Sequence, residues 1–356
     1  MNIFDINPDI RRAETIPADF YTDERYFHAS KEKIFARSWQ FLGADDAAKA
    51  LQPRMILEDF LSEPVLVSRD KTDLHCFSNV CTHRGNILIE NDCADGGIRC
   101  AYHGRRFDLS GKFLSMPEFE TAENFPTKRD DLPEIPFAIW EKFLFASVNP
   151  YAPFDEFVSE MRNKLSWLDF DNLKFTAAKD YLVKAHWALY CENYLEGFHV
   201  PFVHPSLNQA IDYGSYTTDL FPFSSLQTAL TKDERDAFDF SSNARVAAFY
   251  FFIFPNLMFN FYPWGLSVNV VKPLKIDLTK VSYLTFVSDE SKLNGGAGAN
   301  LETVELEDQK VVENVQRGIR SRLYSTGRYS PAREQGTHHF HQLIAKFMRE
   351  DSIINE

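Results

Sequence analysis

The sequence is poor in the features that mark secreted, membrane-spanning and nucleic-acid-binding proteins. Its 38 lysines and arginines are outnumbered by 51 aspartates and glutamates, giving a net charge of −13, whereas nucleic acids and anionic membranes require a basic surface. The start of the chain has no apolar signal-peptide core. The most apolar stretch, residues 246–271, is interrupted by prolines and asparagines, which predicts paired strands instead of a membrane span. We therefore expect a cytoplasmic protein without a nucleic-acid or membrane partner.

Cysteine is also scarce. The chain has five cysteines, and an odd number in a chain of cytoplasmic character argues against a disulfide framework and for metal binding or chemistry. A Gly-x-Gly-x-x-Gly motif after a strand is missing as well, so the chain itself is not expected to bind a nicotinamide cofactor.

The 356 residues are 44% hydrophobic and include 33 phenylalanines, enough apolar material for a sizeable core. Short strand-sized runs separated by glycine turns fill residues 39–149, which predicts a small all-β domain. Two prolines within Asn149–Pro153 then mark a boundary. The pattern after it predicts an α+β domain with a largely antiparallel sheet. The expected helices cover residues 22–37, 154–165, 187–199, 301–323 and 334–350, and the expected strands cover 175–186 and roughly 225–290.

Two short loops of the all-β part combine cysteine with histidine. The first reads Cys81-x-His83 and the second Cys100-x-x-His103, with 16 residues between them and a glycine closing each loop. Two thiolates and two imidazoles suit either a Rieske [2Fe-2S] cluster or tetrahedral zinc. Zinc sites usually pair cysteine with cysteine or histidine with histidine. Each loop here mixes the two residue types, which favours the cluster. Cys76 and Cys93 fit neither loop, and we interpret them as small buried hydrophobic residues.

A second motif, ENYLEGFHVPFVH, covers residues 192–204. Glu196 and His199 are three residues apart, which predicts one shared helix face. His204 would point elsewhere in an unbroken helix, but Pro201 is expected to end the helix and let the chain turn back. The two histidines can then converge on one ion. Glu196 is either a ligand or, as we prefer, a residue that orients a ligand.

A carboxylate would complete a two-histidine, one-carboxylate iron(II) site with open positions. Asp308 falls within an apolar stripe at helical spacing, where an unpaired carboxylate is costly. Glu305 is the competing candidate, while Glu302 and Glu307 are expected to face solvent. The alternatives for Asp308 are an ion pair with Arg320 or Arg322 or a wrongly phased stripe. The stripe consists of Leu301, Val304, Val311, Val312, Val315, Ile319 and Leu323.

These residues resemble the α subunit of the Rieske non-heme iron oxygenases over nearly the whole chain. The resemblance rests on the segments ERYFHASKEKIFARSWQFLG, CTHRG, CAYHG, ENYLEGFHVPFVH and EDQKVVENVQRGIRSRLYSTGRYS. NYLEGFHVPFVHPSL and FPNLMFNFYPW are most similar to the choline and quaternary-ammonium monooxygenase branch. The chain departs from the family at Arg105–Arg106, where most members have tryptophan, and at His186–Ala188, where Asn-Trp-Lys is common.

The resemblance implies a division into an N-terminal segment, 1–37, packed on the catalytic domain, a Rieske domain, 38–150, and a helix-grip catalytic domain, 151–356. It implies a cluster on the four loop ligands, and mononuclear iron on His199, His204 and Asp308. Asn193 would lie close to the iron, and Glu196 would bridge an iron ligand to His103 of a neighbouring subunit in a homotrimer.

The implied activity is that of a terminal oxygenase. An NAD(P)H-dependent reductase or ferredoxin would supply electrons, and oxygen would hydroxylate or oxidatively demethylate a small organic molecule, with quaternary ammonium compounds as one class. The alternatives are ring hydroxylation of an aromatic substrate and a Rieske-type electron carrier without oxygenase activity. A cationic substrate would need aromatic walls, for which the candidates are Phe198, Phe202, Tyr213, Phe251, Phe259 and Tyr262.

Overall fold

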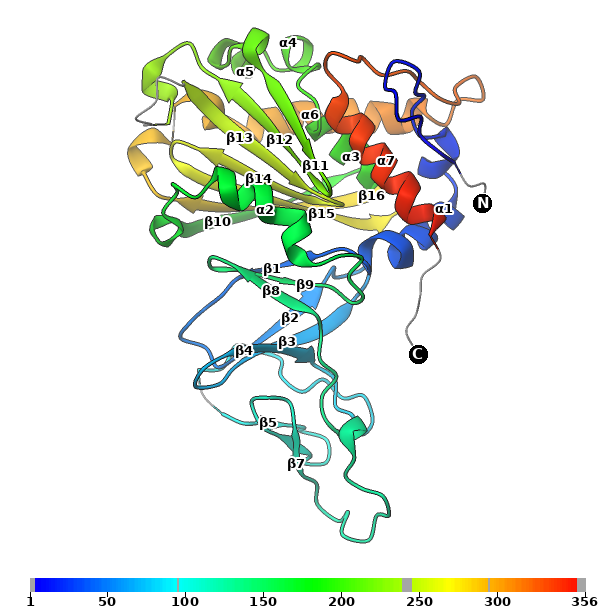
Figure 1. Cartoon of the computed structure of the whole chain (residues 1–356), viewed down its shortest axis with the longest axis vertical. Helices are drawn as coiled ribbons and strands as arrows, with labels where there is room; N and C mark the ends of the chain where they lie inside the picture. The colour runs from blue at the N-terminus through cyan, green and yellow to red at the C-terminus, as the bar shows by residue number, and fades with distance from the viewer. Residues whose placement is uncertain (1–3, 95, 239–244, 294, 351–356) are drawn as a thin grey trace. The chain divides into compact units, whose positions relative to one another are not determined.

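The computed structural model describes residues 4–94, 96–238, 245–293 and 295–350 (Figure 1). The chain divides into two compact units, each described by itself below. The small unit is Ala36–Tyr151, and the large unit combines Met1–Phe35 with Ala152–Glu356.

The small unit is all β, as the short strand-sized runs and glycine turns predict. It contains three antiparallel three-stranded sheets, ordered β1-β9-β8, β2-β3-β4 and β5-β6-β7. A core that includes Leu66, Phe77 and Phe107 also contains Cys81 and Cys100, so the two loops are anchored by apolar packing. The strands are β1 Gln40–Ala44, β2 Leu51–Ile56, β3 Glu63–Arg69, β4 Leu74–Ser78, β5 Ile98–Arg99, β6 Arg106–Phe107, β7 Phe113–Ser115, β8 Phe137–Trp140 and β9 Phe143–Ala146.

The large unit is built on one seven-stranded antiparallel sheet with the order β10-β16-β15-β14-β13-β12-β11. Residues 239–244, within the region expected to form strands, lie outside the described residues. The strands are β10 Lys174–Val183, β11 Thr217–Phe221, β12 Ser224–Leu230, β13 Val246–Ile253, β14 Leu257–Tyr262, β15 Gly265–Lys275 and β16 Leu278–Val287.

Strand register decides which side chains share a face of this sheet. Tyr250 is paired with Asn260, which is in turn paired with Ser267, and Asn269 is paired with Tyr283. Because side chains alternate between faces along a strand, β13 to β16 place these polar and aromatic groups on one face.

The helices of the large unit begin close to where the sequence predicts them, but several end earlier. The first expected helix splits into α1 and a π-helical turn at Lys31–Phe35. α3 stops eight residues into the expected span, and α6 stops at Gly318. α3 packs against β15 and α6, and α7 packs against β11 (Figure 1). The helices are α1 Glu24–Ser30, α2 Phe154–Lys164, α3 Trp187–Tyr194, α4 Val200–Val203, α5 Pro205–Ala210, α6 Leu301–Gly318 and α7 Gln335–Arg349.

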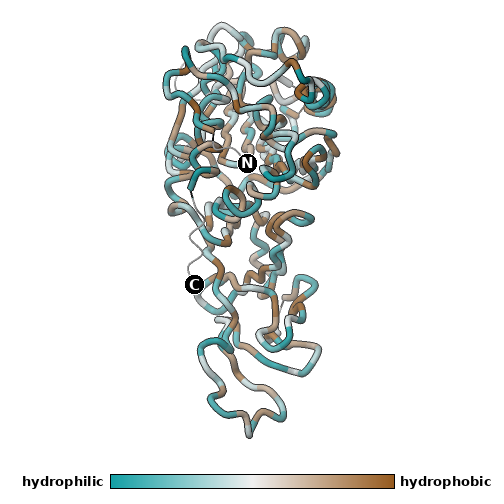
Figure 2. The backbone as a smooth tube through the Cα atoms, turned by 90° about the vertical axis from the view of Figure 1, so that its right-hand side faces the viewer, coloured by the Kyte–Doolittle hydropathy of each residue, from teal (hydrophilic) through white to brown (hydrophobic). Residues whose placement is uncertain are grey.

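Hydrophobic and hydrophilic segments alternate along the chain (Figure 2). Within the described residues, no helix combines the length and the apolar character that crossing a bilayer requires.

Candidate functional site

The two cysteine–histidine loops of the small unit share one backbone geometry. The Gly85 N–H donates to the carbonyl oxygen of Cys81 at 3.0 Å, and the Gly104 N–H donates to that of Cys100 at 3.0 Å. Both glycines have positive φ, 71° and 74°, where a side chain would be strained. Each loop is therefore a tight turn that presents its side chains in the same way.

The four predicted cluster ligands come together between these turns. The Cys81 and Cys100 side chains are buried and their thiols lie within hydrogen-bond reach of one another, while the imidazole centroids of His83 and His103 are 4.9 Å apart. Burial raises the pKa of the Cys81 thiol, so two thiolates in this position need a positive charge beside them. A cluster with one iron on the buried thiolates and one on the more exposed imidazoles fits this donor set.

The other cysteines of the small unit lie outside this group. Cys76 is buried in β4, and burial raises its pKa to about 12. Cys93 donates to the carbonyl oxygen of Asn91 at 3.2 Å. Arg105, one of the departures from the family pattern, is also buried: its guanidinium pairs with Asp130 at 2.6 Å. Arg105 therefore stabilises the unit from within and is not part of its surface.

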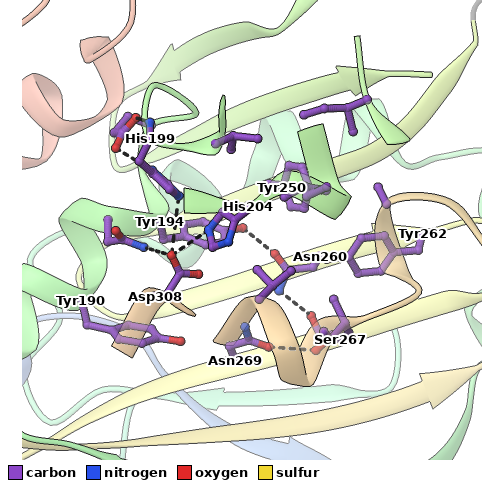
Figure 3. Close-up of a pocket in the computed structure, with 18 of the residues that line it drawn as sticks. Tyr190, Tyr194, His199, His204, Tyr250, Asn260, Tyr262, Ser267, Asn269 and Asp308 are labelled. Atoms are coloured by element: carbon purple, nitrogen blue, oxygen red, sulfur yellow. Dashed lines mark hydrogen bonds and ion pairs between the residues drawn. The ribbon is translucent and has the colours of Figure 1, made fainter. Parts of the chain in front are cut away.

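His199, His204 and Asp308 meet in the large unit (Figure 3). One potential ligand atom from each lies within 4.8 Å of those of the other two. The Nε2 atoms of His204 and His199 are 2.9 and 3.6 Å from the same Asp308 oxygen, Oδ1. Two imidazole nitrogens and one carboxylate on a common centre are the donor set expected for non-heme iron(II).

The backbone that carries the histidines differs from the expectation. α3 ends at Tyr194, so Glu196 and His199 do not share a helix face; both lie in the turn that follows. The Glu196 carboxylate accepts hydrogen bonds from the backbone N–H groups of Phe198 and His199 and thereby shapes this turn. Pro201 does not end a helix either, because it lies in the first turn of α4. Proline is tolerated there since its missing N–H has no partner in a helix start.

Each histidine has a carboxylate on its second ring nitrogen. Glu196 Oε1 is 2.7 Å from His199 Nδ1, and Glu307 Oε2 is 2.7 Å from His204 Nδ1. The Glu307 side chain is 31% exposed, in line with the expectation that it faces solvent, but its contact with the buried His204 was not expected. Burial alone would lower the pKa of His204, but hydrogen bonds to Asp308 and Glu307 and the charges of these groups raise it. Carboxylates in this position fix ring orientation and increase ligand basicity.

Two other residues considered from the sequence, Asn193 of α3 and Glu305 of α6, differ in whether they contact Asp308. Asn193 Nδ2 donates to Asp308 Oδ1 at 2.6 Å, so the amide orients this carboxylate. Glu305, the competing ligand, is buried but points to a separate set of partners. The apolar stripe expected from the sequence is too long, because Leu323 lies beyond the end of α6 and is 99% exposed.

A cavity of about 110 Å³ opens beside this site (Figure 3). This is room for on the order of ten waters, or for a small organic molecule. Besides the imidazoles of His199 and His204, six tyrosines supply the aromatic rings among its lining residues, and none of these described residues is a lysine or an arginine. The tyrosines are Tyr190, Tyr194, Tyr216, Tyr250, Tyr262 and Tyr283.

Of the six aromatic walls proposed from the sequence, only Tyr262 lines this cavity. Phe251 and Phe259 are paired across β13 and β14 on the opposite face of the sheet, and Phe202 is 79% exposed. The polar floor of Asn260, Ser267 and Asn269 was missed as well. Predicting this floor would require the register of strands β13 to β16, which a single sequence does not reveal.

Two family models cover most of the chain. Residues 38–126 match the Rieske [2Fe-2S] domain, and residues 170–350, more than half of the chain, match the ring-hydroxylating α subunit catalytic domain. The chain belongs to the Rieske non-heme iron oxygenase family. It is therefore a Rieske-type oxygenase, and the family's two cofactors are a [2Fe-2S] cluster and a mononuclear iron.

Similar Rieske oxygenases include plant and bacterial enzymes. Choline monooxygenase of Amaranthus tricolor is 30% identical, covering 92% of this chain and 76% of its own length. The corresponding enzyme of Arabidopsis thaliana is 29% identical over 96% and 84%. The carnitine monooxygenase oxygenase subunit of Escherichia coli K12 is 28% identical over 98% and 96%.

Solved structures confirm the fold. A quaternary ammonium Rieske monooxygenase superposes with a TM-score of 0.81 at 23% identity, covering 98% of this chain and all of the other. Naphthalene 1,2-dioxygenase from Rhodococcus sp. superposes with a TM-score of 0.72 at 17% identity, covering 94% of each chain. The prediction of an all-β Rieske domain beside an α+β catalytic domain is thus confirmed.

Proposed function

We propose that this Rieske oxygenase is the terminal component of a system that monooxygenates a quaternary ammonium compound. The observation that carries the proposal is the cavity: its described lining residues include six tyrosines and no lysine or arginine. Tyrosine faces attract cations. The assignments of the choline and carnitine enzymes, to which the chain is similar, agree with this substrate class.

Ring hydroxylation of an aromatic hydrocarbon fits the cavity less well. Asn260, Ser267 and Asn269 place amide and hydroxyl groups on its floor, and a hydrocarbon can form no hydrogen bond with them. An electron carrier without oxygenase activity would have no use for the three-residue centre in the large unit.

We assign the ligands accordingly. Cys81, Cys100, His83 and His103 hold the cluster. His199, His204 and Asp308 hold the iron, which when bound supplies open positions for oxygen. Glu196 and Glu307 orient the two histidines, and Asn193 orients the aspartate.

The same proposal extends to the assembly of the protein. We infer a homotrimer in which Glu196 links His199 to His103 of a neighbouring copy. The 2.7 Å contact of Glu196 with His199 supports one half of this link, and the description of inter-subunit electron transfer in the related solved monooxygenase supports the other. Electrons would come from an NAD(P)H-dependent reductase or a ferredoxin.

The boundaries and location complete the proposal. We assign residues 38–150 to the Rieske domain and 151–356 to the catalytic domain, with 1–37 packed on the latter. Hydrogen bonds from Arg328 to the carbonyl of Ala13 and from Lys33 to that of Met348 support this packing. A cytoplasmic location suits ligand thiols that must stay reduced, and all five cysteines are free.

A coupled assay tests the function. The protein, loaded with cluster and iron, is supplied with NADH and a surrogate reductase, and oxygen uptake and oxidised product are measured with choline, carnitine and naphthalene. We expect product formation coupled to uptake with a quaternary amine only. Coupled oxidation of naphthalene, or uptake without product from every amine, would contradict the proposal.

A further inference from the structure

Glu305 is a buried carboxylate that the iron site does not use. It lies on α6 one turn before Asp308, and only 1% of its surface is exposed. Its Oε2 accepts hydrogen bonds from the hydroxyls of Tyr190 and Tyr283, and its Oε1 accepts one from Gln309 Nε2 at 2.9 Å. All three donors are neutral.

No lysine, arginine or histidine pairs with Glu305 among the residues that the structure describes. A buried carboxylate without a positive partner is expensive, and burial raises the pKa of Glu305 in agreement with that cost. The chain therefore holds an acidic group without a positive partner behind the wall of this cavity.

The two tyrosines connect this group with the cavity. Tyr190 and Tyr283 both line it, and their hydroxyls are 3.0 Å apart as they converge on Glu305. A phenol that donates its proton toward a carboxylate gains electron density in its ring, and a more electron-rich ring attracts a cation more strongly. Glu305 thus makes the rings of Tyr190 and Tyr283, which line the cavity, more attractive to a cation.

Other tyrosines of the cavity have neutral partners. The Tyr194 hydroxyl donates to Asn260 Oδ1 at 2.8 Å, and the Tyr216 hydroxyl donates to Gln227 Oε1 at 3.2 Å. In Figure 3, Tyr190 appears on the side of Asp308, while Tyr250 and Tyr262 lie on the other side of the cavity. The rings that Glu305 makes more electron-rich therefore lie at the Asp308 end of the cavity.

We propose that Glu305 is the counter-charge of the cationic substrate and a positioning residue for Tyr190 and Tyr283, so that it sets the preference for a quaternary ammonium group over an uncharged group of equal shape. This inference rests on the function proposed above and deepens it. It places the ammonium group at the end of the cavity where the iron ligands lie, and the rest of the substrate toward the amide floor.

Calorimetric binding to the cluster- and iron-loaded protein under anaerobic conditions tests the inference without turnover. The probes are choline and its uncharged isostere, in which a tert-butyl group replaces the trimethylammonium group. Glu305→Gln keeps the shape and one of the two acceptor oxygens but removes the charge. We expect choline to bind about tenfold more weakly and the isostere to change by less than about twofold, as expected for weakened cation–π contacts.

Tyr283→Phe is the second variant, because it keeps Glu305 and removes one link. It should also lower the ratio of the two affinities, whereas Tyr216→Phe, the matched control, should not. Cluster absorbance and iron content verify that each variant is folded and loaded. If the wild-type protein prefers choline and both Glu305→Gln and Tyr283→Phe keep this preference, the role of Glu305 is overturned but the proposed function is not. A wild-type protein without the preference would overturn the proposed substrate class and this inference with it.

Discussion

Glu307 offers the sharpest test of how the iron site is built. The expected change is the weakening of iron binding in Glu307→Gln, because the carboxylate that contacts His204 Nδ1 at 2.7 Å becomes a neutral amide. The variant keeps a hydrogen-bond acceptor of the same size and removes only the charge. The His204 side chain is buried and that of Glu307 is about one third exposed.

The magnitude follows from the two kinds of hydrogen bond. A bond to a charged group contributes about 1.5–3 kcal/mol and a neutral one about 0.5–1.5 kcal/mol, so the charge is worth roughly 1 kcal/mol. Solvent screens part of it because Glu307 is partly exposed. We therefore expect an iron(II) affinity weaker by up to about fivefold, just below the range for residues that support metal ligands.

The assay is anaerobic competition for iron(II) between the protein and a chromophoric chelator, with cluster absorbance as the check that the protein is intact. Glu302→Gln is the matched control. It makes the same charge change on the same helix, but Glu302 is 67% exposed and pairs with Lys179 at the surface. Equal iron affinities in the two variants would refute the role assigned to Glu307.

Three further predictions concern the cluster, the third ligand and helix packing. Cys100→Ser should abolish the visible absorption of the cluster while the mononuclear iron remains bound, whereas Cys93→Ser should keep the absorption of the cluster. Asp308→Ala should lose the mononuclear iron and turnover but retain the cluster spectrum; metal analysis that finds iron at wild-type level would exclude this ligand. Gly336→Ala places a Cβ 2.3 Å from the backbone oxygen of Leu195 and should cost about 1–3 kcal/mol in thermal unfolding, while Gly318→Ala, with open space around it, should not destabilise.

Local patterns account for what could be predicted from the sequence. Each cluster loop is a turn of five residues, so its geometry depends on neighbours such as Gly85 and Gly104 that are visible in the chain. The stripe on α6 likewise pointed to Asp308, because three-residue and four-residue spacing fixes a helix face. The convergence of His199 and His204 was expected for the wrong reason, since the turn depends on hydrogen bonds to Glu196 and not on a helix that ends at Pro201.

Contacts between distant segments account for what could not be predicted. Glu307 reaches His204 across 103 residues, and nothing local distinguishes it from the exposed Glu302. The cavity walls depend on strand register: shifting β14 by one residue would exchange Asn260 for Phe259 or Phe261. Composition gave the abundance of aromatic residues but not which of them share a face.

The turn of α6 from Glu305 to Asp308 carries side chains that contact a tyrosine of the cavity wall and His204, and it includes the proposed third iron ligand. This arrangement constrains how such an enzyme can evolve a new substrate specificity. An insertion, deletion or reorientation of this turn would disturb metal binding and cation recognition together, so selection for a new substrate cannot readily act there. The sheet residues Asn260 and Asn269 touch the cavity without contacting a proposed ligand, and they are where new specificities can arise while the catalytic centre is preserved.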